Sequence, residues 1–135
     1  MKKFDNYCRN LDVLAQAEKE NLDNVFIQGG IIDKFYIQFE LSWKLLKELL
    51  RYEGIPESAS GSPREILKAA YACYDFIDEK IWLDMLRDRN DTTHIYDSQK
   101  AQRLVKNVLD TYIPVFQELR KHIEARYTDE LDQLK

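Results

Sequence analysis

Apolar residues recur every three or four positions along almost the whole chain, which is the period of one face of an α-helix. The pattern runs from Phe4 to Leu22 and again from Ile31 to Tyr52. No segment alternates between apolar and polar residues as a half-buried strand does, and no Asn-Gly hairpin signal occurs. The sequence therefore predicts an all-α fold, an up-and-down four-helix bundle with one additional short helix.

Glycine, proline and capping residues indicate where the first helices begin and end. Gly29-Gly30 is expected to separate the first two helices, and Gly54-Ile55-Pro56 to end the second. Ser62-Pro63-Arg64-Glu65 has the form of a capping box with proline at the first helical position. It predicts the start of a third helix, which should stop near Asp75.

The second half of the chain carries similar signals. A fourth helix is expected from about Asp78, and Asp97 or Ser98 is expected to cap the last helix. Pro114 should kink this last helix without ending it. Residues 127–135 are expected to form a polar tail that is frayed or weakly helical.

Length and composition limit the class of protein. A chain of 135 residues, 44% of them hydrophobic, is expected to form one domain, residues 1–135, with its own core. Cys8 and Cys73 have no paired spacing, so both are expected to be buried thiols, with no disulfide and no metal site. The start of the chain lacks the apolar run of a signal peptide, and no run of about eighteen apolar residues occurs. We therefore expect a cytoplasmic protein without membrane contact.

The charge of the chain restricts its contacts with nucleic acid. The formal net charge of −4 at pH 7 argues against broad electrostatic binding to duplex nucleic acid. Arg87 and Arg89 form a short basic cluster, and Arg64, Lys68 and Arg103 are candidates to join it from other helices. Any contact with nucleic acid is therefore expected to be local.

The expected second helix carries more apolar residues than one buried face requires. Phe35, Phe39 and Leu46 lie on one face, and Leu41 and Leu45 widen it. A helix this apolar lies at the centre of a bundle, or it buries a second face against another subunit. The second arrangement predicts a homodimer.

The junction between the fourth and the last helix concentrates groups that suit chemistry on phosphates. It reads Asp88-Arg89-Asn90-Asp91-Thr92-Thr93-His94-Ile95-Tyr96-Asp97. Arginine holds phosphate through a planar guanidinium, and histidine exchanges protons near neutral pH. If one helix continued through His94, Arg89 and His94 would approach a single phosphate from neighbouring stripes.

The other polar residues of the junction would then support this pair. On such a helix Tyr96 would share the face of Arg89, and Asn90 would hydrogen-bond either Arg89 or His94. Asp91 and Asp97, each three residues from His94, would orient the imidazole.

RNA carries its own nucleophile, the ribose 2′-hydroxyl, so one histidine and one arginine suffice to cleave it without a metal. A second copy of each, from a dimer partner, would supply the acid for the leaving group.

Ordinary structural roles explain the same residues. A lone histidine near a helix end is usually a capping or hydrogen-bonded residue. Arg89 can form a surface ion pair with a nearby carboxylate, and Tyr96 can simply close the end of the bundle. Glu40 and Lys44 have the spacing of an ordinary ion pair on one helix face.

The spacing of Arg89, His94 and Tyr96 resembles the Arg-x4-His-x-Tyr signature of the HEPN superfamily. Within it, the chain is most similar to the small bacterial nucleotidyltransferase substrate-binding proteins, also described as HepT-type toxins. The likeness spans roughly Phe4 to Ile123, nearly the whole chain. It extends to further segments in the same order, which are Phe39–Leu46, Ser62–Glu65, Ile81–Leu86 and Tyr112.

The resemblance implies a dimerising helical bundle and a minimal nucleotidyltransferase encoded by a neighbouring gene. In the toxin members the bundle is a metal-independent ribonuclease, and the partner silences it by transferring AMP to the motif tyrosine. Carried over to this chain, His94 would transfer protons, Arg89 would stabilise phosphate, Asn90 would assist and Tyr96 would accept AMP. The resemblance implies neither a cofactor nor a metal.

Two other functions fit the same resemblance. The chain is alternatively a non-catalytic subunit that binds a substrate or nucleotide for a separate nucleotidyltransferase, or a dimeric interaction module alone. The acidic net charge favours the non-catalytic subunit, because binding to many RNAs is helped by a basic surface. The intact set of Arg89, His94 and Tyr96 favours the ribonuclease.

Overall fold

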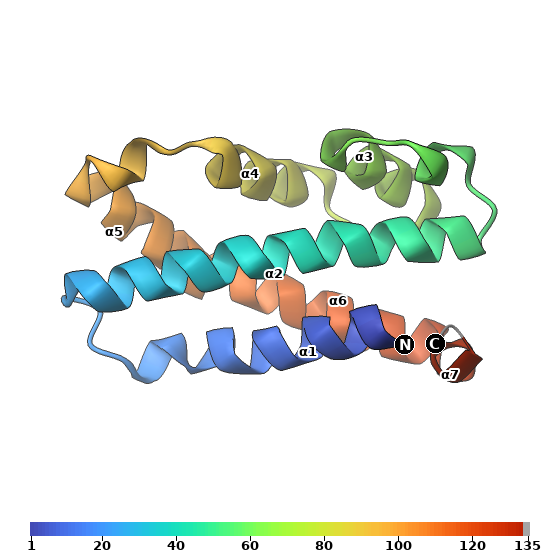
Figure 1. The fold of residues 1–135 in the computed structure, drawn as a ribbon, viewed down its shortest axis with the longest axis horizontal. Coiled ribbons are helices and arrows are strands. Elements are labelled where there is room, and N and C mark those ends of the chain that lie inside the picture. The colour runs from blue at the N-terminus through green and yellow to red at the C-terminus, as the bar shows by residue number, and fades with distance from the viewer. Residues whose placement is uncertain (134–135) are drawn as a thin grey trace.

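The computed structural model describes residues 1–133, and the regular structure among them is entirely helical. Four helical rods run side by side in alternating directions (Figure 1). They are α1 (Lys2–Leu14), α2 (Val25–Tyr52), α3 (Pro63–Cys73) followed by α4 (Glu79–Asn90), and α5 (Ser98–Asn107) followed by α6 (Ile113–Arg126). The predicted all-α, up-and-down bundle is confirmed, and the division of the third rod into α3 and α4 provides the additional short helix.

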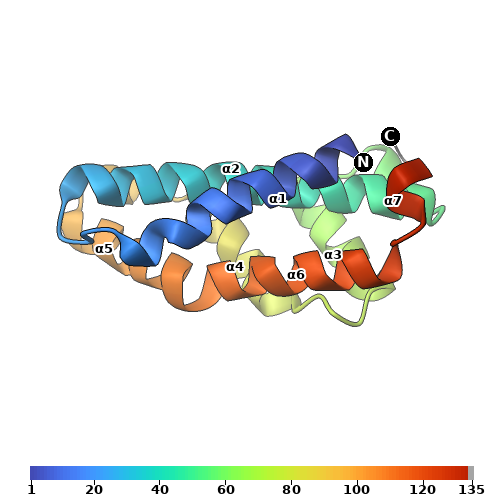
Figure 2. The same cartoon turned by 90° about the horizontal axis from the view of Figure 1, so that it is seen from below.

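The longest helix, α2, lies at the centre of the bundle. It contacts α1, α3, α4 and α5; Figure 1 shows it between α1 on one side and α3 and α4 on the other, and both views show α1 running alongside it (Figures 1 and 2). Phe35, Phe39, Leu45 and Leu49 are fully buried on its different sides. The excess of apolar residues on α2 is therefore used largely within one chain, and dimerisation stays a prediction.

The first residue of α2 differs from the expectation. The helix begins at Val25 and continues through Gly29 and Gly30, so the prediction of a break at this pair was wrong. The side chain of Asn24 caps the helix by accepting hydrogen bonds from the backbone nitrogens of Phe26 (2.8 Å) and Ile27 (3.2 Å). Such a cap contributes about 1 kcal/mol, comparable to the cost of one glycine inside a helix.

Substitution of Gly29 tests whether glycine destabilises α2 by an amount that the Asn24 cap offsets. A Cβ atom at Gly29 would meet nothing within 4 Å, so alanine fits without strain. Gly29→Ala should raise the free energy of unfolding by about 0.5–1 kcal/mol, measured as a higher midpoint of urea unfolding. Gly54→Ala is the control and should lower the midpoint, because Gly54 ends α2 with a φ of 76°. A lower midpoint for Gly29→Ala would contradict the explanation.

The first helix is shorter than expected. α1 ends at Leu14 and continues as a 3-10 turn, η1 (Ala15–Lys19), so the predicted end at Leu22 was wrong. Ala17 is the last buried residue of this segment. The polar residues Glu18–Glu20 that follow offer no apolar side chain to hold a longer helix against the bundle.

The predicted helix starts in the second half of the chain are confirmed. The side chain of Ser62 caps α3 and that of Asp78 caps α4, each accepting a hydrogen bond from the backbone nitrogen three residues later. Between α2 and α3 lies a short 3-10 turn, η2 (Pro56–Ala59). The third helix ends at Cys73, close to the predicted Asp75.

The last rod contains a wide turn before its proline. Its first part, α5, is capped by Asp97 as predicted, and it leads into the π-helical segment η4 (Val108–Tyr112). Pro114, the second residue of α6, has no N–H for the backbone oxygen of the residue four positions before it, which explains a wider turn here. The rod therefore continues through Pro114, as expected, and carries its irregularity in η4.

The end of the chain begins with a buried residue and not with a polar tail. Tyr127 is only 2% exposed, and its hydroxyl is hydrogen-bonded to the hydroxyl of Tyr74 (2.7 Å) and to Glu53 (2.8 Å). The prediction for residues 127–135 was therefore wrong at Tyr127. The short helix α7 (Glu130–Gln133) follows, and residues 134–135 lie outside the described residues.

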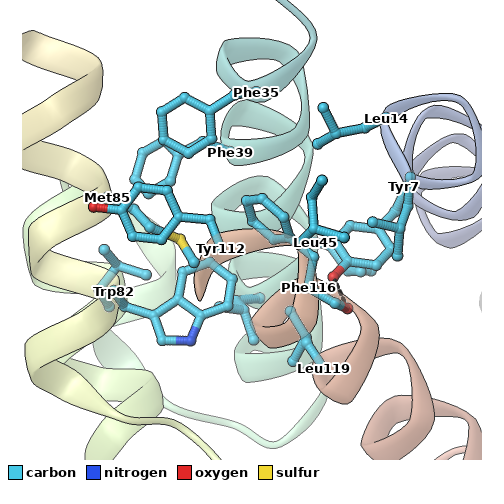
Figure 3. Close-up of a cluster of buried hydrophobic side chains, with 14 of the residues drawn as sticks. Tyr7, Leu14, Phe35, Phe39, Leu45, Trp82, Met85, Tyr112, Phe116 and Leu119 are labelled. Atoms are coloured by element: carbon cyan, nitrogen blue, oxygen red, sulfur yellow. Dashed lines mark hydrogen bonds between the residues drawn. The ribbon is translucent and has the colours of Figure 1, made fainter. Parts of the chain in front are cut away.

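Large aromatic side chains fill the centre of the core (Figure 3). Trp82 of α4 packs edge-on against Phe116 of α6, and Phe35 of α2 stacks on Tyr112. The hydroxyl of Tyr7 donates a hydrogen bond to the backbone oxygen of Phe116 at 2.6 Å, drawn as a dashed line in Figure 3. These contacts join three rods around α2.

The two cysteines are less buried than predicted. Cys8 and Cys73 are both half-buried free thiols. Burial raises the pKa of Cys8 to about 11, so its thiol stays protonated and unreactive near neutral pH. Within residues 1–133, no helix has the length and apolar character needed to cross a membrane.

Candidate functional site

The Arg-His-Tyr motif spans the end of one helix and a turn. α4 ends at Asn90, and His94 lies in the 3-10 turn η3 (Thr93–Ile95), so the prediction of one helix through His94 was wrong. The Asp91 carboxylate accepts hydrogen bonds from the backbone nitrogen of Thr93 (2.9 Å) and from its hydroxyl (2.7 Å). This side-chain turn competes with helical hydrogen bonding, and it also lowers the pKa of Asp91.

His94 is half-buried and held from two sides. Its Nδ1 atom lies 3.0 Å from the backbone oxygen of Asp91, and its Nε2 atom lies 3.1 Å from the hydroxyl of Tyr36 on α2. A carbonyl oxygen can only accept, so this contact favours the neutral tautomer with the hydrogen on Nδ1, in which Nε2 accepts from the Tyr36 hydroxyl; that hydroxyl also lies 3.3 Å from Nδ1. The imidazole therefore presents a basic nitrogen toward α2.

Arg89 is held by an acidic residue of the same central helix. Its guanidinium forms an ion pair with Glu40 and donates a further hydrogen bond to the side chain of Asn90 at 3.2 Å. Glu40 also accepts a hydrogen bond from the indole of Trp43 (3.2 Å) and lies 3.8 Å from Lys44. The expected Glu40–Lys44 pair is present, and Glu40 additionally fixes Arg89.

The central helix brings Arg89 and His94 together. Tyr36 and Glu40 are four residues apart on α2, which corresponds to about 6 Å along the helix axis. Arg89 and His94 are therefore held one helical turn apart against α2. Burial, with added repulsion from Asp91 and Asp33, raises the pKa of the Tyr36 hydroxyl, which stays protonated and able to donate.

Tyr36 and Glu40 are not among the residues that the sequence predicts for this site. The available signal is their spacing of four on the most apolar helix, where both carry a polar end. That spacing alone does not identify the segment they face.

The acidic residues of the motif contact other groups than predicted. The Asp91 carboxylate binds Thr93, and only the backbone oxygen of Asp91 contacts His94. The carboxylate of Asp97 accepts hydrogen bonds from the first turn of α5. Asn90 contacts Arg89, as one of its two expected partners. Asp91 thus supports the imidazole through its main chain, and Asp97 fixes the start of α5.

Tyr112 anchors the start of the motif to the last rod. Its hydroxyl donates a hydrogen bond to the Asp88 carboxylate, which also lies 3.7 Å from Arg87. Burial and the Asp88 charge raise the pKa of Tyr112, so the hydroxyl remains a donor. This hydrogen bond from the last rod therefore holds the end of α4, where Arg89 lies, against the core.

The basic residues of this region divide between two hollows. Arg64, Arg87 and Arg89 line one hollow between the start of α3 and the end of α4. Arg103 and Lys100 instead line a hollow beside His94. The predicted convergence holds for Arg64 and not for Arg103, and Lys68 lines neither hollow.

Two further surfaces border the site. A shallow groove, here called the α2 groove, is lined by Ile37, Leu41, Lys44 and Arg89 beside Tyr36 and Glu40. A separate hollow, here called the η3 hollow, lies between the start of α2, η3 and α5, at the end of the bundle opposite the termini (Figure 1). His94 and Tyr96 both line the η3 hollow, whereas Arg89 does not.

Tyr96 is the most exposed tyrosine of the site. Its side chain is 91% exposed at the end of η3. It does not share a helix face with Arg89, because the helix ends before it. Among residues 1–133, no three His, Cys, Asp or Glu side chains are grouped so that they could hold a metal ion.

The fold and the site define a small helical-bundle protein in which Arg89 of α4 and His94 of η3 are both held against α2. Residues 2–125 match the family model described as nucleotidyltransferase substrate binding protein like. The chain therefore belongs to this family. No curated protein matches the chain.

Proposed function

We propose that the chain is the HEPN component of a two-gene nucleotidyltransferase system, and that it cleaves RNA without a metal until AMP on Tyr96 silences it. One observation carries the proposal most directly. The Nε2 atom of His94 lies within hydrogen-bonding distance of Tyr36, and Arg89 is paired with Glu40 about one helical turn away along α2. This arrangement supports a role of His94 as the base and of Arg89 as the phosphate-binding cation.

In the proposed reaction the 2′-hydroxyl of RNA replaces Tyr36 as the hydrogen-bond donor to His94. The Nε2 atom takes the hydroxyl proton, the 2′-oxygen attacks the adjacent phosphorus, and the bond from phosphorus to the 5′-oxygen breaks. The 5′-oxygen takes a proton and leaves, and the other product ends in a 2′,3′-cyclic phosphate. Arg89 stays paired with Glu40, donates from its remaining N–H groups to the phosphate and stabilises the added negative charge.

We further propose that the protein acts as a homodimer. One histidine serves as the base, and His94 of the second copy would supply the proton for the leaving 5′-oxygen. The α2 groove supports this arrangement, because Ile37 beside Arg89 is 45% exposed despite its apolar side chain. Packing two α2 grooves together would bring two copies of Arg89 into one cleft, and each His94 contacts this groove through Tyr36.

Silencing by the partner nucleotidyltransferase is proposed to act on Tyr96. The phenol oxygen attacks the α-phosphorus of ATP, its proton passes to a base of the partner enzyme, and pyrophosphate leaves. The exposure of Tyr96 supports its role as the acceptor, and its position beside His94 supports an inhibitory effect. The added phosphodiester would repel the RNA backbone and cover the imidazole.

A second candidate function is a non-catalytic subunit that presents a substrate or nucleotide to the nucleotidyltransferase. Its supporting observations are the net charge of −4 and the ion pair of Glu40, which partly neutralises the charge of Arg89. The cytoplasmic location stays a prediction for either function.

RNA cleavage in the presence of a metal chelator separates the two candidates. The purified chain should cut single-stranded RNA in excess EDTA and leave 2′,3′-cyclic phosphate ends. Intact RNA, combined with transfer of AMP to a bound substrate when the nucleotidyltransferase is added, would establish the non-catalytic subunit instead.

Glu40 should act as a positioning residue for Arg89. Glu40→Ala frees the guanidinium from α2, and we expect kcat for RNA cleavage to fall by about tenfold. Glu40→Gln retains an oxygen that accepts from the guanidinium, so it should keep most of the activity. Both variants should stay folded, because a partly exposed ion pair contributes at most about 1 kcal/mol. Equal losses in the two variants would contradict the positioning role.

A further inference from the structure

The lining of the η3 hollow is apolar and acidic, and such a lining does not favour a phosphate. Its walls include the apolar residues Val25, Ile32 and Ala101, and its polar lining includes the carboxylates of Asp23 and Asp33. No lysine or arginine belongs to the described lining. A phosphate inside the hollow would be repelled, whereas a neutral group that donates hydrogen bonds would be stabilised.

Gln28 adds an acceptor to this lining. Its side chain is only 6% exposed, and its Nε2 atom donates a hydrogen bond to the backbone oxygen of Leu22 at 2.8 Å. Its Oε1 atom accepts no hydrogen bond from residues 1–133. The Asp33 carboxylate likewise has no hydrogen bond or ion pair with the described residues. Asp23 and Asp33 are exposed, and no buried side-chain polar atom of the described residues lacks a hydrogen-bond partner, so these acceptors are open to solvent and to a ligand in the hollow.

Gly29 keeps the α2 side of the hollow open. It lies inside a helix, where glycine costs about 1 kcal/mol relative to alanine. A Cβ atom at this position would meet no atom within 4 Å, so packing inside the chain does not require glycine. A ligand that approaches the α2 backbone closely would require it.

We propose that the η3 hollow binds the nucleoside part of a nucleotide, and that it holds the adenosine of AMP attached to Tyr96. This proposal rests on the proposed silencing of the protein by its partner enzyme. The apolar walls suit a flat base, and the acceptors suit the ribose hydroxyls and the amino group of adenine. The phosphate would stay at the rim, where Tyr96 lies, outside the acidic interior.

An RNA nucleotide is the other source of the same chemistry. The phosphates of an RNA chain in the hollow would be repelled by the carboxylates of Asp23 and Asp33. AMP on Tyr96 carries only one phosphodiester, and its attachment to Tyr96 fixes this group at the rim. The tethered nucleotide also loses less entropy than a free one when it enters the hollow, because its effective concentration there is high.

Titration of the unmodified, full-length chain with adenosine tests the hollow itself. Adenosine should shift the backbone amide NMR signals of Gly29 and Ala101 in a saturable manner. Gly29→Met fills the hollow and should weaken binding by about tenfold or more. Gly30→Met is the matched control and should bind normally, because Gly30 lines a different hollow and its added side chain also meets open space. An absence of saturable shifts, or equal binding by Gly29→Met and the wild type, would overturn the proposal.

Release of AMP from the modified protein identifies the occupant. After co-expression with the nucleotidyltransferase, a phosphodiesterase should release AMP about tenfold more slowly from the wild type and Gly30→Met than from Gly29→Met. Equal release rates, together with a raised KM of unmodified Gly29→Met for RNA, would assign the hollow to RNA and overturn the tethered adenosine. If an active partner adds no AMP to Tyr96, the proposed silencing fails, and the adenosine titration still decides whether the hollow binds a nucleoside.

Discussion

His94→Ala should reduce the rate of RNA cleavage by about 100-fold or more, because the variant lacks the base that takes the 2′-hydroxyl proton. Arg89→Ala should cause a loss of similar size, because the guanidinium that Glu40 holds against α2 is the proposed stabiliser of the phosphate. Arg89→Lys should restore little, since an ammonium group does not reproduce the planar contacts of a guanidinium. The measurement is the initial rate of cleavage of a labelled single-stranded RNA in EDTA.

The chain contains matched controls for both substitutions. His122 is the second histidine, and it is exposed on α6 with its ring stacked on Phe76. Arg51 is an exposed arginine on α2 that pairs only with Glu48. His122→Ala and Arg51→Ala should cleave RNA at the wild-type rate. Full activity of both His94→Ala and Arg89→Ala would remove the assignment of these residues to catalysis.

Tyr96→Phe should eliminate transfer of AMP to the chain and leave RNA cleavage permanently active. The substitution removes only the phenol oxygen that accepts the AMP, and the ring is exposed, so the stability of the fold should change by less than about 0.5 kcal/mol. The measurement is the mass of the intact protein after co-expression with the nucleotidyltransferase, followed by the RNA cleavage assay.

Tyr71 supplies the control for this second prediction. It is a tyrosine on α3 that is 53% exposed. Tyr71→Phe should still gain AMP and lose its cleavage activity, as we predict for the wild type. If Tyr96→Phe gained the same mass as the wild type, the acceptor would be another residue and the switch at Tyr96 would be excluded.

The architecture could be predicted because local patterns and global packing agree. The buried residues Phe4, Tyr7, Leu11 and Leu14 follow the helical period that the sequence displays. Side-chain caps of α3, α4 and α5 also lie within a few residues of their helices, so they are readable in the sequence. The prediction at Gly29-Gly30 was wrong because glycine lowers helix stability by an amount that the Asn24 cap offsets.

The arrangement of the site depended on contacts that spacing does not contain. The Asp91 turn ends α4 before His94, and this short-range competition between side chain and helix is hard to weigh from sequence. Tyr36 precedes His94 by 58 residues and Glu40 precedes Arg89 by 49 residues, and only packing of α4 and η3 against α2 shows that they hold His94 and Arg89. The sequence alone singles out Arg89 and His94 as candidates, and the tertiary structure shows the side chains that they contact.

The rate of RNA cleavage by separated unmodified and AMP-modified protein tests the central claim most directly. Co-expression with the nucleotidyltransferase should give both forms, which ion exchange can separate by the added charge. We predict that the unmodified form cuts RNA in EDTA and leaves cyclic phosphate ends, and that the form with AMP on Tyr96 leaves the RNA intact. Equal cleavage by the two forms, or intact RNA with both, would contradict the account.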